Sequence, residues 1–455
     1  MNATERRSTF ALGSIFALRM LGLFMIVPVF AIAGQQYSGA TPALLGLAVG
    51  IYGLSQALLQ IPFSLWGDYV SRRGLIIFGL ILFALGNAIA ALSTDIWQVI
   101  IGRAIAGSGA ISAVVMALLA DVTREEQRSK AMAIMGMSIG TSFMLAFIIG
   151  PLLTSHIGLS GLFWFSSIAG ILAILLLLLV PHVSIQHKQA SGHYREKFKL
   201  VLNNANLNRL HISIFMLHLI MTALFVFIPS QLVEWAGIPV NHHGWVYLPL
   251  LLISCFFAFP SIIVAEKKQQ MRYIFMAAIF SITAALIVLS LFYTTPWGLI
   301  LGLALFFIAF NVIEALLPSW LSKIALPSVK ATAMGINASS QFLGAFFGGV
   351  LGGQLLSSSN TSMAWTILVG FAVIWLGVSW FLESPRYLST LTVDLPAESQ
   401  NLNDWSTQIL QVQGVEEIAI LKVQGIAYIK FDPKDLNDEA RQKLSQLVNQ
   451  PVAFS

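Results

Sequence analysis

The chain has 455 residues, of which 57% are hydrophobic and only 10% are charged, and its mean hydropathy is +0.81. Soluble domains carry about 25% charged residues, so this composition excludes a soluble protein and indicates a polytopic membrane protein. Cys255 is the only cysteine, which excludes an intramolecular disulfide and a cysteine-based metal site.

Twelve apolar segments approach the length that a helix needs to span a bilayer. Because each apolar run is unbroken, we expect α-helices rather than barrel strands. The segments lie near residues 10–33, 43–63, 74–93, 96–120, 131–154, 160–181, 208–231, 244–264, 272–293, 297–318, 330–355 and 362–382.

Lysine and arginine are concentrated in alternate loops, and the loops between them carry neither. This is the positive-inside pattern, and it places both termini in the cytoplasm. Because the basic residues are confined to alternate loops, the net charge of +5 does not indicate a nucleic-acid partner. A cleaved signal peptide is disfavoured, because the first apolar run is too long for one and contains Arg19.

Polar residues inside the first two segments are candidates for a central cavity. A charge inside a span costs about 2.5–3.5 kcal/mol, so Arg19 should face a partner or a cavity, or else snorkel to the interface. In the second segment Gln56 and Gln60 share one helix face and either line a polar path or pack. Gly46 and Gly50 before them allow close helix approach.

The loop at residues 64–73 reads Ser-Leu-Trp-Gly-Asp-Tyr-Val-Ser-Arg-Arg and lies between two membrane-length segments. Its charges must lie at a water-facing helix end. The spacing resembles the signature of the major facilitator superfamily between helices 2 and 3, Gly-x-x-x-Asp-(Arg/Lys)-x-Gly-Arg-(Arg/Lys). Asp68, Arg72 and Arg73 match this signature.

The match has three departures. Ser64 and Ser71 stand where the family has glycine, and Tyr69 stands where it has a basic residue. These replacements leave the fine geometry of the turn open.

The fourth segment carries Arg103 near its start and Asp121 at its end. Arg103 with Gly107 resembles the helix-4 motif of the family, and Arg103 is a further candidate for the cavity. The resemblance implies that Asp68, Arg72 and Asp121 form a latch that holds helices 2, 4 and 11 in the outward-facing state. The alternative is a solvated charge cluster that only fixes topology.

The fifth segment contains Gly150-Pro151, and proline in a spanning helix removes one hydrogen bond and bends the chain. The antiporter motif of the family has Gly-Pro here, followed by two glycines. This chain continues with Leu152 instead, so a plain kink is the alternative to an antiport signal.

The stretch 182–207 is the longest linker and divides the chain into six-helix bundles at 1–181 and 208–386. The bundles resemble repeats, since Pro62…Asp68 is matched by Pro260…Glu266. Two such repeats are what the major facilitator fold requires.

Two ionisable residues lie within spans of the second bundle. Glu314 is a carboxylate well inside the tenth segment, where it either couples protons to transport or pairs structurally with an arginine. Asn311 lies one turn away and is a candidate for substrate contact. His218 in the seventh segment is either a packing residue or a proton relay.

Residues 387–455 differ in composition from the rest of the chain, with frequent charge and a β-α-β-β-α-β pattern that predicts a ferredoxin-like cytoplasmic domain. Its last strand is predicted at 451–454. The topology resembles heavy-metal-associated domains, but no cysteine or histidine is present, so that metal site is excluded. Membrane-domain docking, self-association or small-ligand binding remain as roles.

The family resemblance implies an all-α membrane protein of the bacterial inner membrane that works as a proton-driven secondary transporter by alternating access. We expect export of a small amphipathic or anionic compound, as in drug-efflux members. An uptake symporter for a small nutrient and a non-transporting sensor are the alternatives. No enzyme constellation, phosphate loop or cofactor motif is visible in the sequence.

Overall fold

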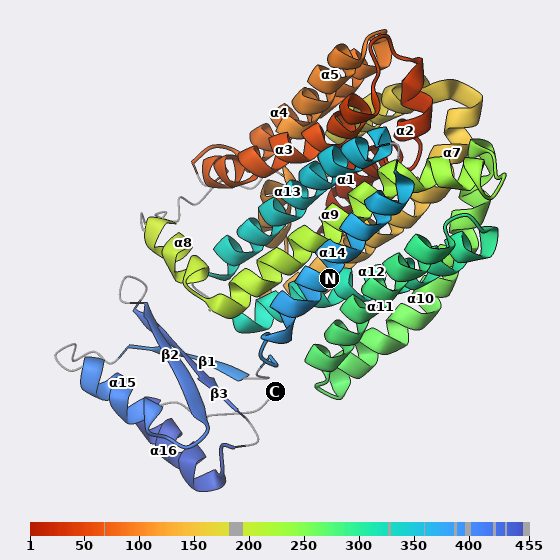
Figure 1. Ribbon diagram of the computed structural model, residues 1–455. Helices are drawn as coiled ribbons and strands as arrows, with labels where there is room; N and C mark the ends of the chain where they lie inside the picture. The colour runs from red at the N-terminus through yellow and green to blue at the C-terminus, as the bar shows by residue number, and fades with distance from the viewer. Residues whose placement is uncertain are drawn as a thin grey trace.

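The structure is a computed structural model that combines a bundle of long helices with a small α+β domain beside one end of it (Figure 1). We call this end of the bundle the terminal end and the opposite end the far end. The described residues are 1–67, 69–181, 194–325, 329–358, 360–385, 389–395, 402–421, 425–432 and 435–448.

Several helices in the first half of the bundle begin at a side-chain cap. Thr41 accepts a hydrogen bond from the backbone N–H of Leu44, and Asp95 accepts one from Trp97. The elements are α1 (Ala3–Phe24), α2 (Phe30–Ala33), η1 (Gly34–Gln36), α3 (Pro42–Trp66), α4 (Arg72–Leu92), α5 (Ile96–Ser108), α6 (Ser112–Val122) and α7 (Glu125–Leu177).

The helix α7 is two helices joined at Gly158. This glycine has φ of +67°, a left-handed conformation that a residue with a side chain rarely adopts. The two parts correspond to the predicted segments 131–154 and 160–181. The chain therefore changes direction where the sequence had placed a short loop.

The second half begins with a short helix inside the predicted linker 182–207, of which residues 182–193 lie outside the described part. The elements are α8 (Tyr194–Leu202), α9 (Ala205–Glu234), η2 (Val240–His242), α10 (His243–Lys267), α11 (Met271–Phe292), α12 (Pro296–Ile324), α13 (Lys330–Ser357) and α14 (Thr361–Trp380).

Within the described residues, nine helical stretches are long and apolar enough to cross a membrane. They are Pro42–Trp66, Arg72–Leu92, Ile96–Val122, Lys130–Leu177, Ala205–Glu234, Val240–Lys267, Met271–Phe292, Pro296–Ile324 and Thr361–Trp380. The more polar helices α1 and α13 are not among these nine, although each packs along other long helices of the bundle.

The small domain contains β1 (Ser389–Asp394), α15 (Leu402–Leu410), β2 (Val415–Leu421), β3 (Ile426–Phe431) and α16 (Asp438–Val448). Its three strands are antiparallel in the order β1-β3-β2, with Val393 and Ile420 both opposite Ala427. Alternate residues of the strands pack with Ile409 and Leu444 of the helices in one core. The strand predicted at 451–454 lies outside the described residues.

Candidate functional site

The two halves meet at the far end through direct backbone contact between α3 and α13. A Cβ atom on Gly46 would lie 2.2 Å from the carbonyl oxygen of Gly349, and one on Gly353 would lie 2.6 Å from that of Pro42. The contact runs as far as Ser339, whose hydroxyl donates to the carbonyl of Ala57 at 3.3 Å. Only glycine permits this approach, so the far half of the interface is closed.

A cluster of aromatic side chains closes the same end between α7 and the second half. Phe147 is fully buried and lies 4.5 Å from Phe225, 5.9 Å from Tyr247 and 6.0 Å from Phe307 between ring centroids. Phe143, Phe147, Phe225, Tyr247, Phe307 and Phe310 are called the aromatic plug below. Among these six side chains the phenol of Tyr247 is the one polar group.

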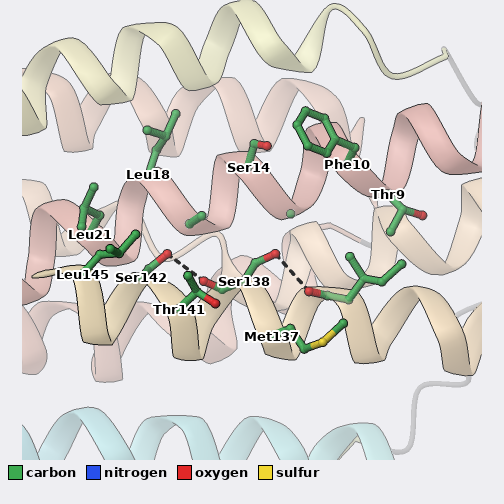
Figure 2. Close-up of a pocket in the computed structure, with 13 residues that line it drawn as sticks. Thr9, Phe10, Ser14, Leu18, Leu21, Met137, Ser138, Thr141, Ser142 and Leu145 are labelled. Carbon is green, nitrogen blue, oxygen red and sulfur yellow. Dashed lines mark hydrogen bonds between the residues drawn. The ribbon is translucent and has the colours of Figure 1, made fainter. Parts of the chain in front are cut away.

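Towards the terminal end the interface is open. Gly335 of α13 and Gly136 of α7 have no atom within 4 Å of a built Cβ. A cavity of about 440 Å³ lies along α1 and the first part of α7 (Figure 2). The halves are thus joined at the far end, and towards the terminal end open space lies along α1 and α7.

The cavity wall is uncharged, and its polar groups are hydroxyls. Ser138 and Ser142 donate to carbonyls of their own helix at 3.0 and 2.7 Å, as Figure 2 shows, so their oxygens keep only acceptor capacity for a ligand. The other lining residues are Thr9, Phe10, Gly13, Ser14, Ala17, Leu18, Leu21, Ile134, Met137, Thr141 and Leu145. Such a wall suits an apolar ligand with hydrogen-bond donors.

Glu314, Gln341 and His218 come together from α12, α13 and α9. The Gln341 amide donates to the Glu314 carboxylate at 3.2 Å and lies 2.8 Å from His218 Nε2. His218 Nδ1 lies 3.2 Å from the Ile214 carbonyl, so the neutral ring with its proton on Nδ1 satisfies both bonds. The Glu314 side chain is 36% exposed, while that of His218 is 4% exposed. The Glu314 Oε2 atom is buried and has no hydrogen-bond partner among the described residues. The carboxyl of a half-buried side chain is therefore joined to a buried imidazole through one amide.

This cluster lies one turn from the aromatic plug. Phe310 precedes Glu314 by four residues on α12, and its ring lies 5.9 Å from that of His218. Asn311, on the same turn, donates to the hydroxyl of Ser254 at 2.8 Å and thereby joins α12 to α10. The candidate proton site and the closed seam are thus built on the same helix.

The two arginines predicted for the cavity are buried in the first half. Arg19 is 3% exposed, donates to Ser112 at 3.1 Å and contacts Gln56, which in turn donates to Gln60 at 2.9 Å. None of these four residues lines the cavity in this conformation. The Nε of Arg19 is buried and has no hydrogen-bond partner among the described residues.

Arg103 lies at the closed side, behind α3. It is 1% exposed and donates to the carbonyls of Ala48 and Val49 at 3.2 and 3.3 Å. Its guanidinium lies 5.0 Å from the ring centroid of Tyr52, a cation–π contact. These bonds tie α5 to α3 near the glycine contact.

Two residues of the predicted latch lie together. Arg72 forms an ion pair with Asp121 and donates to the carbonyls of Gly67 and Ala117 at 3.3 and 3.4 Å. Arg73 donates to Val180 at 3.3 Å. Asp68 lies outside the described residues, so its part in the latch stays a prediction.

The serines that replace the motif glycines have different environments. Ser71 caps α4 by accepting from the backbone N–H of Gly74 at 3.3 Å, a role that glycine fills less well. Ser64 is an exposed residue of α3. In the second half Glu266, which the predicted repeat matches with Asp68, forms an ion pair with Lys323.

Gly150 and Pro151 lie within the first part of α7. A Cβ on Gly150 would be 2.5 Å from the carbonyl oxygen of Met25, so the glycine permits α7 to pack closely on the end of α1. The carbonyl of Gly150 accepts from Thr154 Oγ1 at 2.7 Å. The pair lies at the closed end of the interface.

Sequence reasoning missed Gln341, the hydroxyl wall and an ion pair at the terminal end. Gln341 follows Asn337, Ser339 and Ser340, a polar run inside a span that could have identified it. Glu5 accepts from Arg124 Nε at 2.9 Å and from its backbone N–H at 3.1 Å. The Arg124 guanidinium, with backbone N–H groups, lowers the pKa of this carboxyl from 4.5 to about 2.

Comparison with known proteins identifies the family. The profile of the Major Facilitator Superfamily matches residues 12–327, and a profile described as "Sugar (and other) transporter" matches residues 246–416. The chain therefore belongs to the major facilitator superfamily, which makes it a secondary transporter and not an enzyme.

Two known proteins are similar to the chain over most of its length. The chain is 42% identical over 452 residues to the inner membrane transport protein YajR of Escherichia coli K12, with 99% of each chain covered. It is 24% identical to the multidrug resistance protein MdtH of Aeromonas salmonicida over 81% of this chain and 94% of that protein.

A solved structure shares the fold. An inward-facing, occupied bacterial homolog of the human lysosomal transporter Spinster superposes with a TM-score of 0.66 at 16% identity, over 84% of this chain and 97% of that one. At this identity the likeness shows the fold alone.

Proposed function

We propose that the protein is a proton-coupled transporter with twelve spans in the bacterial inner membrane. The nine apolar stretches are completed by α1, α13 and the division of α7 at Gly158. The halves are then 1–181 and 208–386, joined by a linker at 182–207, and both termini are cytoplasmic. Residues 387–455 form a ferredoxin-like domain, supported by the strand order β1-β3-β2 with two helices.

The observation that carries the proposal is the cluster of Glu314, Gln341 and His218, one turn from the aromatic plug. The Glu314 side chain is partly exposed, and its carboxyl is held by Gln341 beside the neutral His218. In the open conformation it exchanges a proton with the terminal side. When the halves rock, the same group meets the far side, and the proton crosses with the change of state.

The substrate we propose is a small amphipathic compound that is exported. The uncharged wall of α1 and α7, with its serine oxygens, favours an apolar body with donor groups. An anionic group would be attracted by Arg19, a buried residue of α1 whose Nε has no hydrogen-bond partner among the described residues. The multidrug resistance relative supports the direction of transport.

The test is substrate-induced pH change in proteoliposomes, with cationic drugs, organic acids and sugars compared in the wild type and Glu314→Gln. We expect proton movement opposite to substrate in the wild type and none in the variant, with substrate exchange retained. Asn311→Asp on the same turn controls for a general effect of polarity change near the site. Unchanged coupling in Glu314→Gln would assign this residue a structural role.

A second candidate is an uptake symporter for a small nutrient, which the sugar-transporter profile over residues 246–416 favours. Proton and substrate movement in the same direction would establish it. Deletion of 387–455 separates both transporters from a sensor, because a transporter keeps its flux without that domain.

A further inference from the structure

The helix α8 runs across the terminal ends of the bundle helices instead of along them (Figure 1). It is followed by α9, whose Asn206 amide donates to the Glu383 carboxylate after α14 at 2.9 Å. Trp380 and Phe381, just before Glu383, are 65% and 67% exposed. Exposed aromatic side chains at helix ends mark the membrane–water interface, so α8 lies at that level.

Val201 and the group of Leu202, Arg195 and Lys199 lie on different sides of α8. Val201 is fully buried against the bundle and fixes the orientation of the helix. At 3.6 residues per turn, Leu202 lies about 100° from Val201, and Arg195 and Lys199 lie about 120° and 160° from it. Leu202 is 52% exposed, and both basic residues are exposed. An exposed leucine thus adjoins a pair of cations four residues apart.

We propose that α8 binds anionic phospholipid at the membrane surface, with Arg195 and Lys199 on the lipid phosphates and Leu202 at the acyl boundary. A basic helix with exposed apolar side chains fits this surface, since its leucine would be unfavourable in water or on a nucleic acid. The proposal rests on the proposed function only in that the chain spans a bilayer.

Lipid bound to α8 would also affect the bundle, because of where α8 packs. Besides α9, α8 packs against α13. The same α13 supplies Gln341 to the proton site and Gly349 to the closed seam. Lipid bound to α8 therefore holds the end of the helix on which both halves meet.

The test uses the full chain in nanodiscs of phosphatidylcholine, alone or mixed with phosphatidylglycerol. Because Cys255 is the only cysteine, Cys255→Ser with Leu202→Cys gives a single site for a nitroxide label. Power saturation then compares its accessibility to oxygen and to a water-soluble nickel complex. Glu196→Cys, which lies about 120° from Leu202 around α8, is the matched label position.

We expect the label at 202 to be shielded from nickel and the label at 196 to be accessible. Each basic group near an anionic surface raises the affinity for it about fivefold. Arg195→Gln with Lys199→Gln should therefore lower the affinity of α8 for phosphatidylglycerol roughly thirtyfold, and the phosphatidylglycerol-dependent shielding should fall with it. Lys267→Gln with Lys268→Gln removes the same charge from the end of α10 and should leave it unchanged. High salt should remove the lipid dependence in the unsubstituted chain.

Equal nickel accessibility at 202 and 196 in both lipids would overturn the proposal. An equal loss in the α10 pair would also overturn it, because the effect would then be general electrostatics. Neither result depends on transport, so failure here leaves the proposed proton coupling to its own test.

Discussion

The far and terminal ends of the seam between the halves are built from different types of residue. At the far end α3 and α13 touch through glycine, and the aromatic plug fills the space between α7 and the second half. At the terminal end the first half surrounds open space with serine, threonine and scattered apolar side chains of α1 and α7. Dry, close contact can exist at only one end at a time when two rigid halves rock, so the composition of each end sets the conformational equilibrium.

The largest effect is expected at the glycine contact. Gly46→Ala places a methyl group 2.2 Å from the Gly349 carbonyl oxygen, and overpacking of this kind costs about 1–3 kcal/mol. We expect the far-closed population to fall about 5- to 160-fold. Distances between spin labels at Gln36 and Glu234, on far-end segments of the two halves, measure it.

The control for this variant is Gly335→Ala, which lies on the same α13 but has open space around it. It should leave the distance distribution unchanged. Equal shifts from both variants would show that helix propensity, and not the seam, controls the equilibrium.

A smaller effect on closure of the seam is expected from the aromatic plug, because only part of the cost of truncation falls on closure. Phe147→Ala removes ring contacts with Phe225, Tyr247 and Phe307, and such truncations cost about 3–5 kcal/mol, shared between closure and folding. Access to Cys255, whose sulfur lies 3.5 Å from that of Met144, should rise about tenfold or more for a thiol reagent added at the far side.

Phe280→Ala is the matched truncation, because Phe280 is 63% exposed on the outer surface of α11. Cys255 should react at the wild-type rate in this variant. A wild-type rate in Phe147→Ala as well would mean that α3 and α13 alone close the far end.

The smallest effect is expected from the ion pair of Glu5 and Arg124, which lies at the terminal end but within one half. Because the pKa of Glu5 is lowered from 4.5 to about 2, its contribution is complete above the unfolded value and is lost as pH falls towards 2. We expect Glu5→Gln to lower the Tm at neutral pH and to flatten its decline below pH 4.5.

Label distances between the halves should not change in Glu5→Gln. A change would mean that this ion pair belongs to the seam and not to the first half alone. The three variants together thus separate contacts that close the seam from contacts that only stabilise one side of it.

The sequence predicted the helices well because a bilayer leaves few alternatives to a helix of membrane length. The twelve apolar segments each overlap described helix, and family membership is confirmed. The segment over 96–120 was predicted as one helix, but it is broken between α5 and α6 at Gly109, where a close approach to Gly79 leaves no room for a side chain. Periodicity gave no sign of this break.

The candidate site was predicted only in pieces. Glu314 and His218 stood out as ionisable groups inside spans, and the structure brings them together through Gln341. Arg19 stood out for the same reason, yet its bonds to Ser112 and Gln56 turn it away from the cavity in this conformation. Whether a polar residue meets a cavity or a neighbour depends on helix rotation, which its own sequence does not set.

The amino-acid sequence by itself determined the membrane class, the helix positions and the presence of a separate domain after 387, because hydropathy and charge act locally along the chain. Only the tertiary structure decided which end of the seam is closed and which groups share the proton site. Those features come from contacts between residues such as Gly46 and Gly349, about 300 positions apart, whose packing depends on how whole helices are placed.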